Sequence, residues 1–258
     1  MAKFRAARRI WAAAMRDRFG TTNPKAMTMR FHTQTGGVTL TAQQAYNNIV
    51  RVALQGFAAV AGGTQSLHTN GYDEALALPS ERAAKIALRT QQIIGAESGA
   101  TDTVDPFAGS YFVESLTAEL ERRARGLIDK VDEMGGSVNA IAFIKSEIEE
   151  SAFGYHERYR TKQDIVVGVN KYEEDEIEVE EILRVDPETE RDQLQRLERF
   201  KAERDQELAS KRLEELKGAA EGTDNLLPYI KRALKDHCSI GEVCGAMREH
   251  FGEYRPEH

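Results

Sequence analysis

Residues 30–79 decide the fold of this chain and read RFHTQTGGVTLTAQQAYNNIVRVALQGFAAVAGGTQSLHTNGYDEALALP. Two short segments, 29–35 and 64–69, resemble strands that end in polar residues, and an amphipathic helix pattern over 42–60 separates them. A strand, a helix and a second strand in this order are typical of parallel βα units. The sequence therefore predicts an α/β fold with two adjacent parallel strands.

Polar side chains gather where these two strands end. They are His32, Gln34, Gln65, Ser66, His68, Asn70 and Glu74. In parallel βα folds, ligands bind at the carboxyl ends of the strands, so we expect a binding site here. Gly36 and Gly37 allow either a tight turn or close approach of the backbone to a ligand. A structural role stays open. The histidines could be hydrogen-bonded packing residues, and Glu74 could be a carboxylate in the first turn of a helix, where it interacts favourably with the helix dipole.

The rest of the chain is mostly helical in pattern. We expect further helices over 3–19, 80–96, 111–134, 138–150, 152–161, 188–218, 225–235 and 240–251. Thr41 and Ser80 are expected N-caps, and Ile86, Ile93 and Ile94 are expected to face inward. A third strand is predicted at 164–170 and a short one at 182–185, with an acidic linker over 173–181 between them.

The number of strands bounds the architecture. A complete (β/α)₈ barrel needs eight strands, and this chain offers at most four. The sequence therefore predicts a partial (β/α)₈ TIM barrel, made of its last βα units, over residues 1–172. An acidic linker and a carboxyl-terminal helical extension follow over 173–258.

Composition excludes several classes of function. The net charge of −7 over 258 residues argues against a general nucleic-acid binder, and no apolar run reaches the length of a membrane span. Cys238, Cys244 and His250 lack zinc-ligand spacing, so we expect no metal site. The first 20 residues are rich in arginine, as mitochondrial presequences are, but Gly20 ends a clean helix pattern and a strand follows. We therefore expect a cytoplasmic protein rather than one of the mitochondrial matrix.

Seven motifs in a fixed order resemble those of one family. They are HTQTGG, TAQQAYNNIVRVAL, GGTQSLHTN, DEALALP, TQQIIGAESG, VDPFAGSYFVE and VGVNKY. Over residues 3–255 the chain resembles the carboxyl-terminal part of the large, substrate-binding subunit of the methylmalonyl-CoA mutases. The resemblance implies a (β/α)₈ barrel that threads an acyl-CoA along its axis and is capped by the corrin of adenosylcobalamin. It also implies a radical 1,2-rearrangement of the acyl-CoA carbon skeleton.

The resemblance also implies roles for individual residues. His32 and Gln34 are expected in the active-site wall, as catalytic residues close to substrate and corrin. Glu74 is expected to hold the adenosyl ribose, because a carboxylate accepts charge-assisted hydrogen bonds from vicinal hydroxyls. The expected cofactor-binding set is completed by Gln34, Gln65, Ser66 and Asn70 at the barrel mouth and by Ala75 and Leu78 against the corrin.

Parts of the family pattern are missing from this chain. The first part of the barrel, which carries the tyrosine and arginine that read the acyl group, is not in the sequence. The cobalamin motif DxHxxG is also missing, since in DHCSIG at 236–241 the aspartate and histidine are adjacent. The resemblance thus implies a chain inactive alone, with the amino-terminal barrel half and a small cobalamin-binding subunit as partners. Two alternatives stay open: a non-catalytic structural or interaction subunit of the same fold, and a self-sufficient α/β enzyme with another small substrate.

Overall fold

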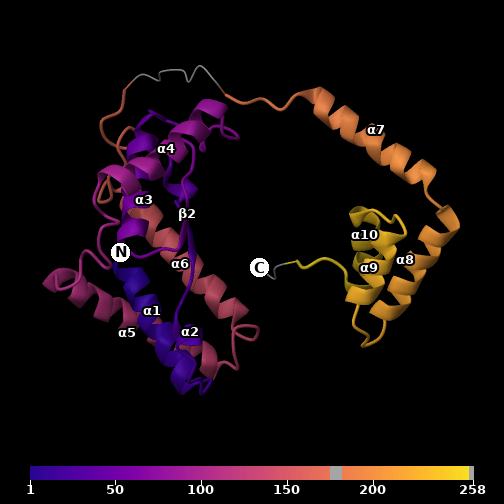
Figure 1. The fold of residues 1–258 in the computed structure, drawn as a ribbon, viewed down its shortest axis with the longest axis horizontal. Coiled ribbons are helices and arrows are strands. Elements are labelled where there is room, and N and C mark those ends of the chain that lie inside the picture. The colour runs from indigo at the N-terminus through magenta and orange to yellow at the C-terminus, as the bar shows by residue number, and fades with distance from the viewer. Residues whose placement is uncertain (175–181, 256–258) are drawn as a thin grey trace. The chain divides into compact units, whose positions relative to one another are not determined.

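The computed structural model describes residues 1–174 and 182–255 and consists of two compact units, Met1–Arg184 and Val185–His258. Figure 1 shows the elements of both units along the chain. Most of the predicted acidic linker lies outside the described residues. The functional division expected at residue 172 stays a prediction. Among the described helices, none is long and apolar enough to cross a membrane.

The first unit is a mostly helical α/β structure with two strands. Its elements are α1 (Ala2–Asp17), α2 (Pro24–Met27), β1 (His32–Gln34), the 3₁₀ turn η1 (Gly37–Thr39), α3 (Asn47–Ala61), β2 (Ser66–His68), α4 (Glu81–Glu97), α5 (Tyr111–Glu133) and α6 (Ile141–Arg160). The predicted strand, helix and strand order of residues 30–79 is confirmed. Both strands are shorter than the sequence pattern suggested.

The two strands run parallel and pair His32 with Ser66 and Gln34 with His68. The side chains between these pairs, Thr33 and Leu67, are half-buried, whereas the four paired side chains are exposed. Because side chains alternate along a strand, the sheet has one packed face and one open face. The packed face lies against α3.

Helix α3 packs on both α4 and β2. Gly56 permits the close approach, because a Cβ added there would lie 3.1 Å from Ile94 Cδ1 and 3.8 Å from Leu67 Cδ2. Ile94 is buried as predicted, but Ile93 is 52% exposed, so its predicted inward orientation is wrong. In a helix, adjacent residues point about 100° apart, and only one of the two isoleucines can face α3.

The two expected N-caps have different outcomes. Ser80 accepts a hydrogen bond from the backbone N–H of Ala83 and caps α4, as predicted. The prediction for Thr41 is wrong, because α3 begins at Asn47 and the preceding residues form turns. The side chain of Asn48 bonds both backbone groups of Thr41, at 3.1 Å to its N–H and 2.9 Å to its carbonyl oxygen. These two bonds satisfy the backbone N–H and carbonyl oxygen of Thr41 without a helix at this point.

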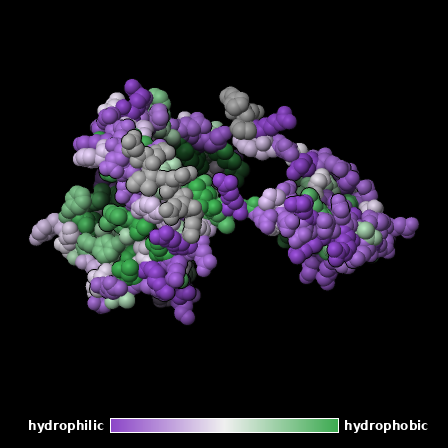
Figure 2. All heavy atoms as spheres, turned by 90° about the horizontal axis from the view of Figure 1, so that it is seen from above, coloured by the Kyte–Doolittle hydropathy of each residue, from purple (hydrophilic) through white to green (hydrophobic). Residues whose placement is uncertain are grey.

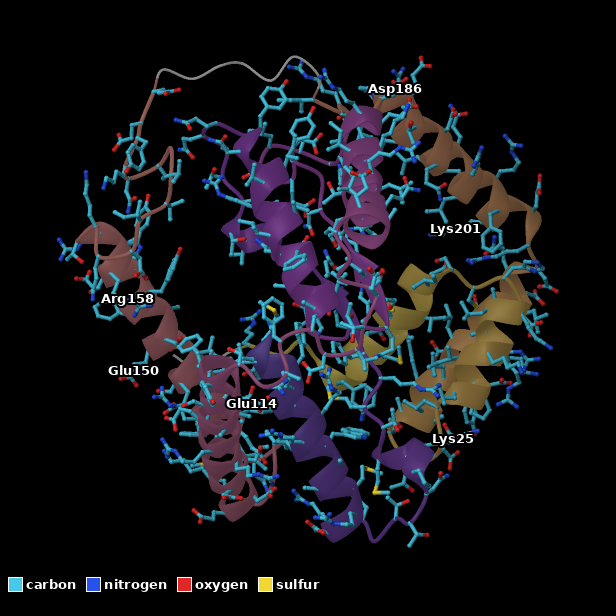
Figure 3. The ribbon with its side chains drawn as sticks, turned by 60° about the vertical axis from the view of Figure 1, so that its left-hand side comes forward. Lys25, Glu114, Glu150, Arg158, Asp186 and Lys201 are labelled. Carbon is cyan, nitrogen blue, oxygen red and sulfur yellow. The ribbon has the colours of Figure 1, made fainter. Side chains whose placement is uncertain are left out.

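A buried arginine joins α1 to α5. Arg5 is 8% exposed and donates to Asp105, Glu114 and Thr117 at 3.0, 2.6 and 3.1 Å. The Arg5 guanidinium, helped by the backbone N–H of Gly109, lowers the pKa of Glu114 to about 2. Glu114 lies on the face of α5 that meets α1 (Figure 3). The predicted helices at 3–19 and 111–134 are thus confirmed, and the ion pair between Arg5 and Glu114 joins them.

The chain after α5 differs from the prediction in two ways. The two short helices expected at 138–150 and 152–161 form one continuous helix, α6. The strand expected at 164–170 is absent from the described part of the chain, where the segment forms turns and one isolated bridge. The side chain of Asn170 bonds the Val166 N–H and the Asp164 and Tyr159 carbonyl oxygens, which holds the segment in a turn.

The second unit contains α7 (Pro187–Glu203), α8 (Gln206–Ala220), α9 (Leu227–Lys235) and α10 (Ile240–Phe251). The predicted short strand at 182–185 is not formed. The core of the second unit consists of Ala209, Leu216, Ala233, Cys238, Val243 and Ala246. The single long helix expected over 188–218 is wrong, because the chain breaks at Arg204, whose ψ of 161° is extended. Asp205 then caps α8 by accepting from the backbone N–H of Leu208 at 2.9 Å.

Candidate functional site

The open face of the sheet carries four of the predicted site residues. His32 and Gln34 lie on β1 and are paired with Ser66 and His68 on β2, and all four side chains are exposed. His32 Nδ1 lies 2.8 Å from Ser66 Oγ. This bond fixes the imidazole ring through one nitrogen and leaves Nε2 directed away from Ser66. The parallel register therefore brings together side chains that are 34 residues apart in sequence.

Asn70 follows β2 and is held against the end of β1. Its side chain is buried, and its Oδ1 accepts from Thr35 Oγ1 at 2.6 Å. Its backbone N–H donates to the same hydroxyl at 3.0 Å, and the Thr35 N–H donates to the His68 carbonyl oxygen at 3.0 Å. Among the described residues, no hydrogen bond is donated by Asn70 Nδ2. One amide nitrogen with two N–H groups is thus fixed in place and free to bind.

Glu74 and Asn70 meet at Gly37. A Cβ added at Gly37 would lie 3.0 Å from Asn70 Nδ2 and 3.3 Å from both Cγ and Oε1 of Glu74. We call this space, bounded by Gly37, Asn70 and Glu74, the Gly37 notch. The Glu74 carboxylate is exposed and has no hydrogen-bond partner within the described residues. The notch therefore combines an unused amide donor with an unused carboxylate acceptor beside bare backbone.

The other predicted cofactor-binding residues are placed differently. Gln65 precedes β2, where its side chain accepts from the Phe31 N–H at 2.8 Å and donates to the Gly63 carbonyl oxygen at 2.9 Å. Its side-chain amide is thus already bonded to the backbone, at the opposite end of the strands from the notch. Ala75 and Leu78 follow Glu74 and are exposed, Leu78 to 60%. Their position next to the notch leaves both apolar side chains open to a large ligand.

The loop that carries Glu74 is supported by buried polar residues that the sequence pattern did not reveal. Asp73 is fully buried and accepts from the Ser80 N–H at 2.8 Å. Asn48 donates to the Tyr72 carbonyl oxygen at 2.8 Å. Burial, together with the neighbouring Tyr46, raises the pKa of the Tyr72 phenol. Only the adjacency of Asp73 to a candidate site residue hinted at this role.

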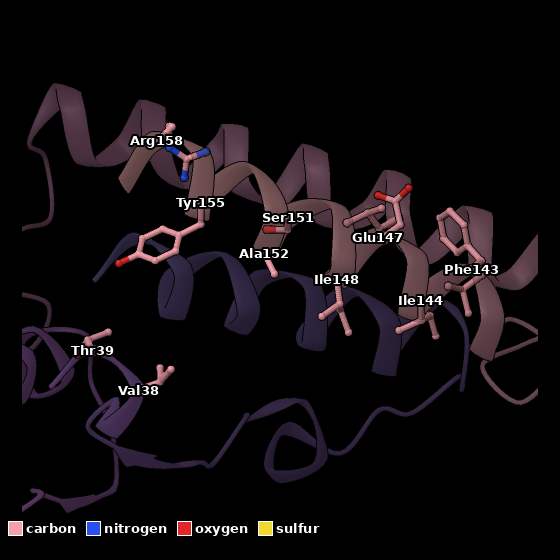
Figure 4. A pocket seen from close by; sticks show the side chains of 12 residues that line it. Val38, Thr39, Phe143, Ile144, Glu147, Ile148, Ser151, Ala152, Tyr155 and Arg158 are labelled. Carbon is pink, nitrogen blue, oxygen red and sulfur yellow. The ribbon is translucent and has the colours of Figure 1, made fainter. Parts of the chain in front are cut away.

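A large apolar hollow lies near the tip of the turn after β1. Its volume is about 980 Å³, and its walls come from η1, α5 and α6. Figure 4 shows Phe143, Ile144 and Ile148 along α6 on one side, with Val38 across the hollow from Tyr155. Val38 is 97% exposed, and α6 has no buried residue within the described structure. The sequence pattern predicted α5 and helical structure in the α6 region, but not this uncovered face.

Comparison with known proteins gives a consistent result over almost the whole chain. A family model described as methylmalonyl-CoA mutase matches residues 1–253. The methylmalonyl-CoA mutase of Cereibacter sphaeroides is 46% identical over 260 residues, covering 99% of this chain and 36% of that protein. The mitochondrial methylmalonyl-CoA mutase of Mus musculus is 43% identical over 259 residues, covering 99% of this chain and 35% of that protein.

A third relative carries a different name. The 2-hydroxyisobutanoyl-CoA mutase large subunit of Aquincola tertiaricarbonis is 42% identical over 259 residues, covering 99% of this chain and 46% of that protein. This chain therefore spans between about a third and a half of the length of these curated relatives.

Proposed function

Because this chain belongs to the methylmalonyl-CoA mutase family, we propose that it forms the carboxyl-terminal part of the barrel of an adenosylcobalamin-dependent acyl-CoA mutase. The named relatives are CoA mutases, so the family is one of isomerases. The proposed reaction is a radical 1,2-rearrangement of an acyl-CoA carbon skeleton. In this proposal the chain is inactive alone and needs the other barrel half and a cobalamin-binding subunit.

The Gly37 notch is the observation that carries this proposal. An adenosyl ribose has two vicinal hydroxyls, which donate and accept hydrogen bonds. The Glu74 carboxylate can accept from both hydroxyls, and Asn70 Nδ2 can donate to one of them. Gly37 leaves the backbone bare beside both groups, where a Cβ would lie 3.0 Å from Asn70 Nδ2. The residues present therefore fit the adenosyl group in charge and hydrogen bonding.

The remaining site residues have complementary parts in the proposed mechanism. When bound, adenosylcobalamin would supply the radical chemistry of the rearrangement. His32 and Gln34 would line the cavity and orient the acyl thioester, with the His32 ring held by Ser66. Ala75 and Leu78 would cover the corrin and exclude water. Gln65 would act by joining the strand starts, where its side chain is already bonded.

The open faces of the first unit support the partners in this proposal. Two strands leave one face of the sheet uncovered, and the apolar side of α6 is uncovered as well. Figure 2 shows green, apolar side chains gathered in patches on the visible surface of this unit, beside purple, hydrophilic ones. Contiguous apolar surface of this kind is typical of protein interfaces. An amino-terminal barrel half would close the lumen over His32 and Gln34, and the relative named as a large subunit is consistent with a small partner.

The test of this function is assembly followed by a cofactor measurement. The chain is mixed with the complementary barrel half and a cobalamin-binding chain, and binding of adenosylcobalamin and hydroxocobalamin is followed by visible absorption. Assembly that improves binding of adenosylcobalamin over hydroxocobalamin supports the proposal. Assembly without cofactor binding would instead favour a non-catalytic structural subunit. Binding of acyl-CoA by this chain alone, insensitive to cobalamin, would favour a self-sufficient enzyme.

Glu74→Ala tests the ribose contact directly. We expect the affinity of the assembled enzyme for adenosylcobalamin to fall by about 1.5–3 kcal/mol, the contribution of a charge-assisted hydrogen bond. Affinity for hydroxocobalamin, which has no ribose at this position, should stay constant. Glu97→Ala on the exposed side of α4 is the matched control, because it removes a carboxylate away from the notch. Equal losses for both cobalamins would refute the assigned contact.

The compartment remains a prediction. We propose the cytoplasm, while the named relatives include both a mitochondrial and a bacterial protein.

A further inference from the structure

Gln55 on α3 holds both ends of the turn that follows β1. Its Oε1 accepts from the Gly36 N–H at 2.5 Å, and its Nε2 donates to Thr39 Oγ1 at 2.7 Å. The Thr39 hydroxyl in turn donates to the Gly36 carbonyl oxygen at 2.7 Å. A single amide thus uses its acceptor and its donor to connect the first and the last residue of the turn. We call this set of bonds the Gln55 brace.

The residue inside the brace is Gly37, which forms the floor of the notch. The Glu74 carboxylate has no hydrogen bond within the described residues, and its Oε1 lies 3.3 Å from the Cβ position of Gly37. Asn70, on the other wall, is fixed separately by Thr35. How close the backbone comes to these two polar walls therefore depends on where the brace holds Gly37.

The brace is attached to a well-packed element. Gln55 is next to Gly56, which is buried against Ile94, and Val52 and Ala59 on the same helix are also buried. A side chain on a packed helix positions its partners more accurately than one on a loop. Helix α3 can therefore act as the fixed reference from which the turn is placed.

From this geometry we propose that Gln55 is a positioning residue for the ribose subsite, an inference that rests on the proposed function. It sets where the Gly37 backbone lies against the Asn70 amide and the Glu74 side chain by holding the Gly36–Thr39 turn, and it does not touch the ribose itself. Loss of the brace lets the turn move, and a polar site loses affinity when its groups shift by about 1 Å. The affected ligand group is the vicinal diol of the adenosyl moiety.

Three variants in the assembled enzyme test this role. Gln55→Met keeps the length of the side chain and removes both bonds. Gln55→Glu keeps an acceptor for the Gly36 N–H, and Thr39→Val removes the other half of the brace. Dissociation constants for adenosylcobalamin and hydroxocobalamin are measured by visible absorption, and the melting temperature is recorded for each variant. Gln92→Met is the control, since Gln92 is exposed on α4 and bonds Arg89.

We expect Gln55→Met to weaken adenosylcobalamin binding about five- to tenfold, the effect of losing one hydrogen bond between the ribose and the notch. Hydroxocobalamin binding should change less than about twofold. Gln55→Glu should restore most of the affinity. Thr39→Val should weaken binding less, and the double variant with Gln55→Met should lose less than the sum, because both residues act through one turn.

The outcomes separate this inference from the proposed function. If Glu74→Ala weakens adenosylcobalamin binding and Gln55→Met does not, the positioning role is wrong and the function stands. Equal loss for both cobalamins together with a lower melting temperature would make Gln55 purely structural. If Glu74→Ala has no effect on adenosylcobalamin, the proposed function fails, and the inference fails with it. Should Gln55→Met not fold, Gln55→Glu and Thr39→Val decide by the same criteria.

Discussion

Gly37 has no side chain, and its Cβ position faces both Asn70 and Glu74 in the notch. Of the two roles that the glycine pair allowed, the tight turn is formed, since the Thr39 N–H donates to the Gly36 carbonyl oxygen at 3.0 Å and neither glycine has a positive φ. Close approach to a ligand stays a prediction. A turn of this shape would accept other residues. What excludes them is the 3.0 Å distance from the Cβ position of Gly37 to Asn70 Nδ2.

Gly37→Ala should therefore weaken cofactor binding more than folding. The added methyl group meets Glu74 at 3.3 Å and must push its side chain by a few tenths of an ångström. We expect about tenfold weaker binding of adenosylcobalamin by the assembled enzyme and a change of less than about 1 kcal/mol in the free energy of unfolding. Absorption titration and urea denaturation measure the two quantities.

The control for this substitution is Gly245→Ala in α10. Nothing lies within 4 Å of the Cβ position there, so only helix propensity changes. It should stabilise the protein by about 0.5–1 kcal/mol and leave cobalamin binding as it was. Unchanged binding in Gly37→Ala as well would contradict the assigned use of the notch.

At the residue scale, the sequence predicted the element on which a residue lies better than the partner that its side chain bonds. The strand pattern placed His32 and Ser66 on two adjacent strands, and the structure shows that the parallel register pairs them. Gln55 could not be found in this way. Its role depends on the rotation of α3 relative to the turn, which the 3.6-residue period of the helix does not specify. Gln65 was identified as polar and near a strand, but only the structure shows that its amide is bonded to backbone groups.

At the scale of elements, capping and local side-chain bonds decided most differences from prediction. The apolar stripe continues through residues 188–218, so the pattern favoured one helix. Asp205 instead starts a new helix, and Arg204 pairs with Glu242 at 2.7 Å through both guanidinium ends. The segment 164–170 is apolar enough for a strand, but a strand also needs a neighbour, and the Asn170 bonds favour a turn. Long, strongly periodic helices such as α1 and α5 were predicted almost to their ends.

The ion pair between Arg204 and Glu242 should make the second unit sensitive to acid. The Arg204 guanidinium, with further bonds from Ser239, lowers the pKa of Glu242 from 4.5 to about 2. A lowered carboxyl pKa adds stability above the unfolded value, and this stability is lost as pH falls from about 4.5 toward 2. The free energy of unfolding of Glu242→Gln should therefore be lower at neutral pH and should fall less on acidification.

Urea denaturation of both proteins at about pH 6 and about pH 3 measures the difference. Glu249→Gln on the same helix is a suitable control, because that carboxylate is 65% exposed and bonded only to Lys217 among the described residues. Identical acid dependence in the wild type and in Glu242→Gln would mean that the pair contributes nothing to pH sensitivity.

At the scale of the whole molecule, the two units have separate cores. The second unit is organised around Leu216, which is fully buried among residues of α8, α9 and α10. The first unit is joined instead by the α1 and α5 contact and the α3 and α4 contact. Units with separate cores unfold as separate cooperative transitions.

Leu216→Ala should reveal this independence. Removing a buried leucine side chain costs about 2–5 kcal/mol, and here the loss falls on the second unit alone. We expect calorimetry of the full chain to show two transitions, of which only one moves to lower temperature. Leu194→Ala on α7 is the control, because that side chain is 52% exposed. A single transition that shifts as a whole would contradict the separation.

The short parallel sheet has one further consequence, and it concerns supply in the cell. Each strand pairs with a neighbour on one side only within the described residues, so two rows of backbone groups stay available to other chains. Under the proposed function, an excess of this chain over its partner would therefore tend to associate with itself through these backbone groups. The amount of partner would then limit the yield of assembled enzyme.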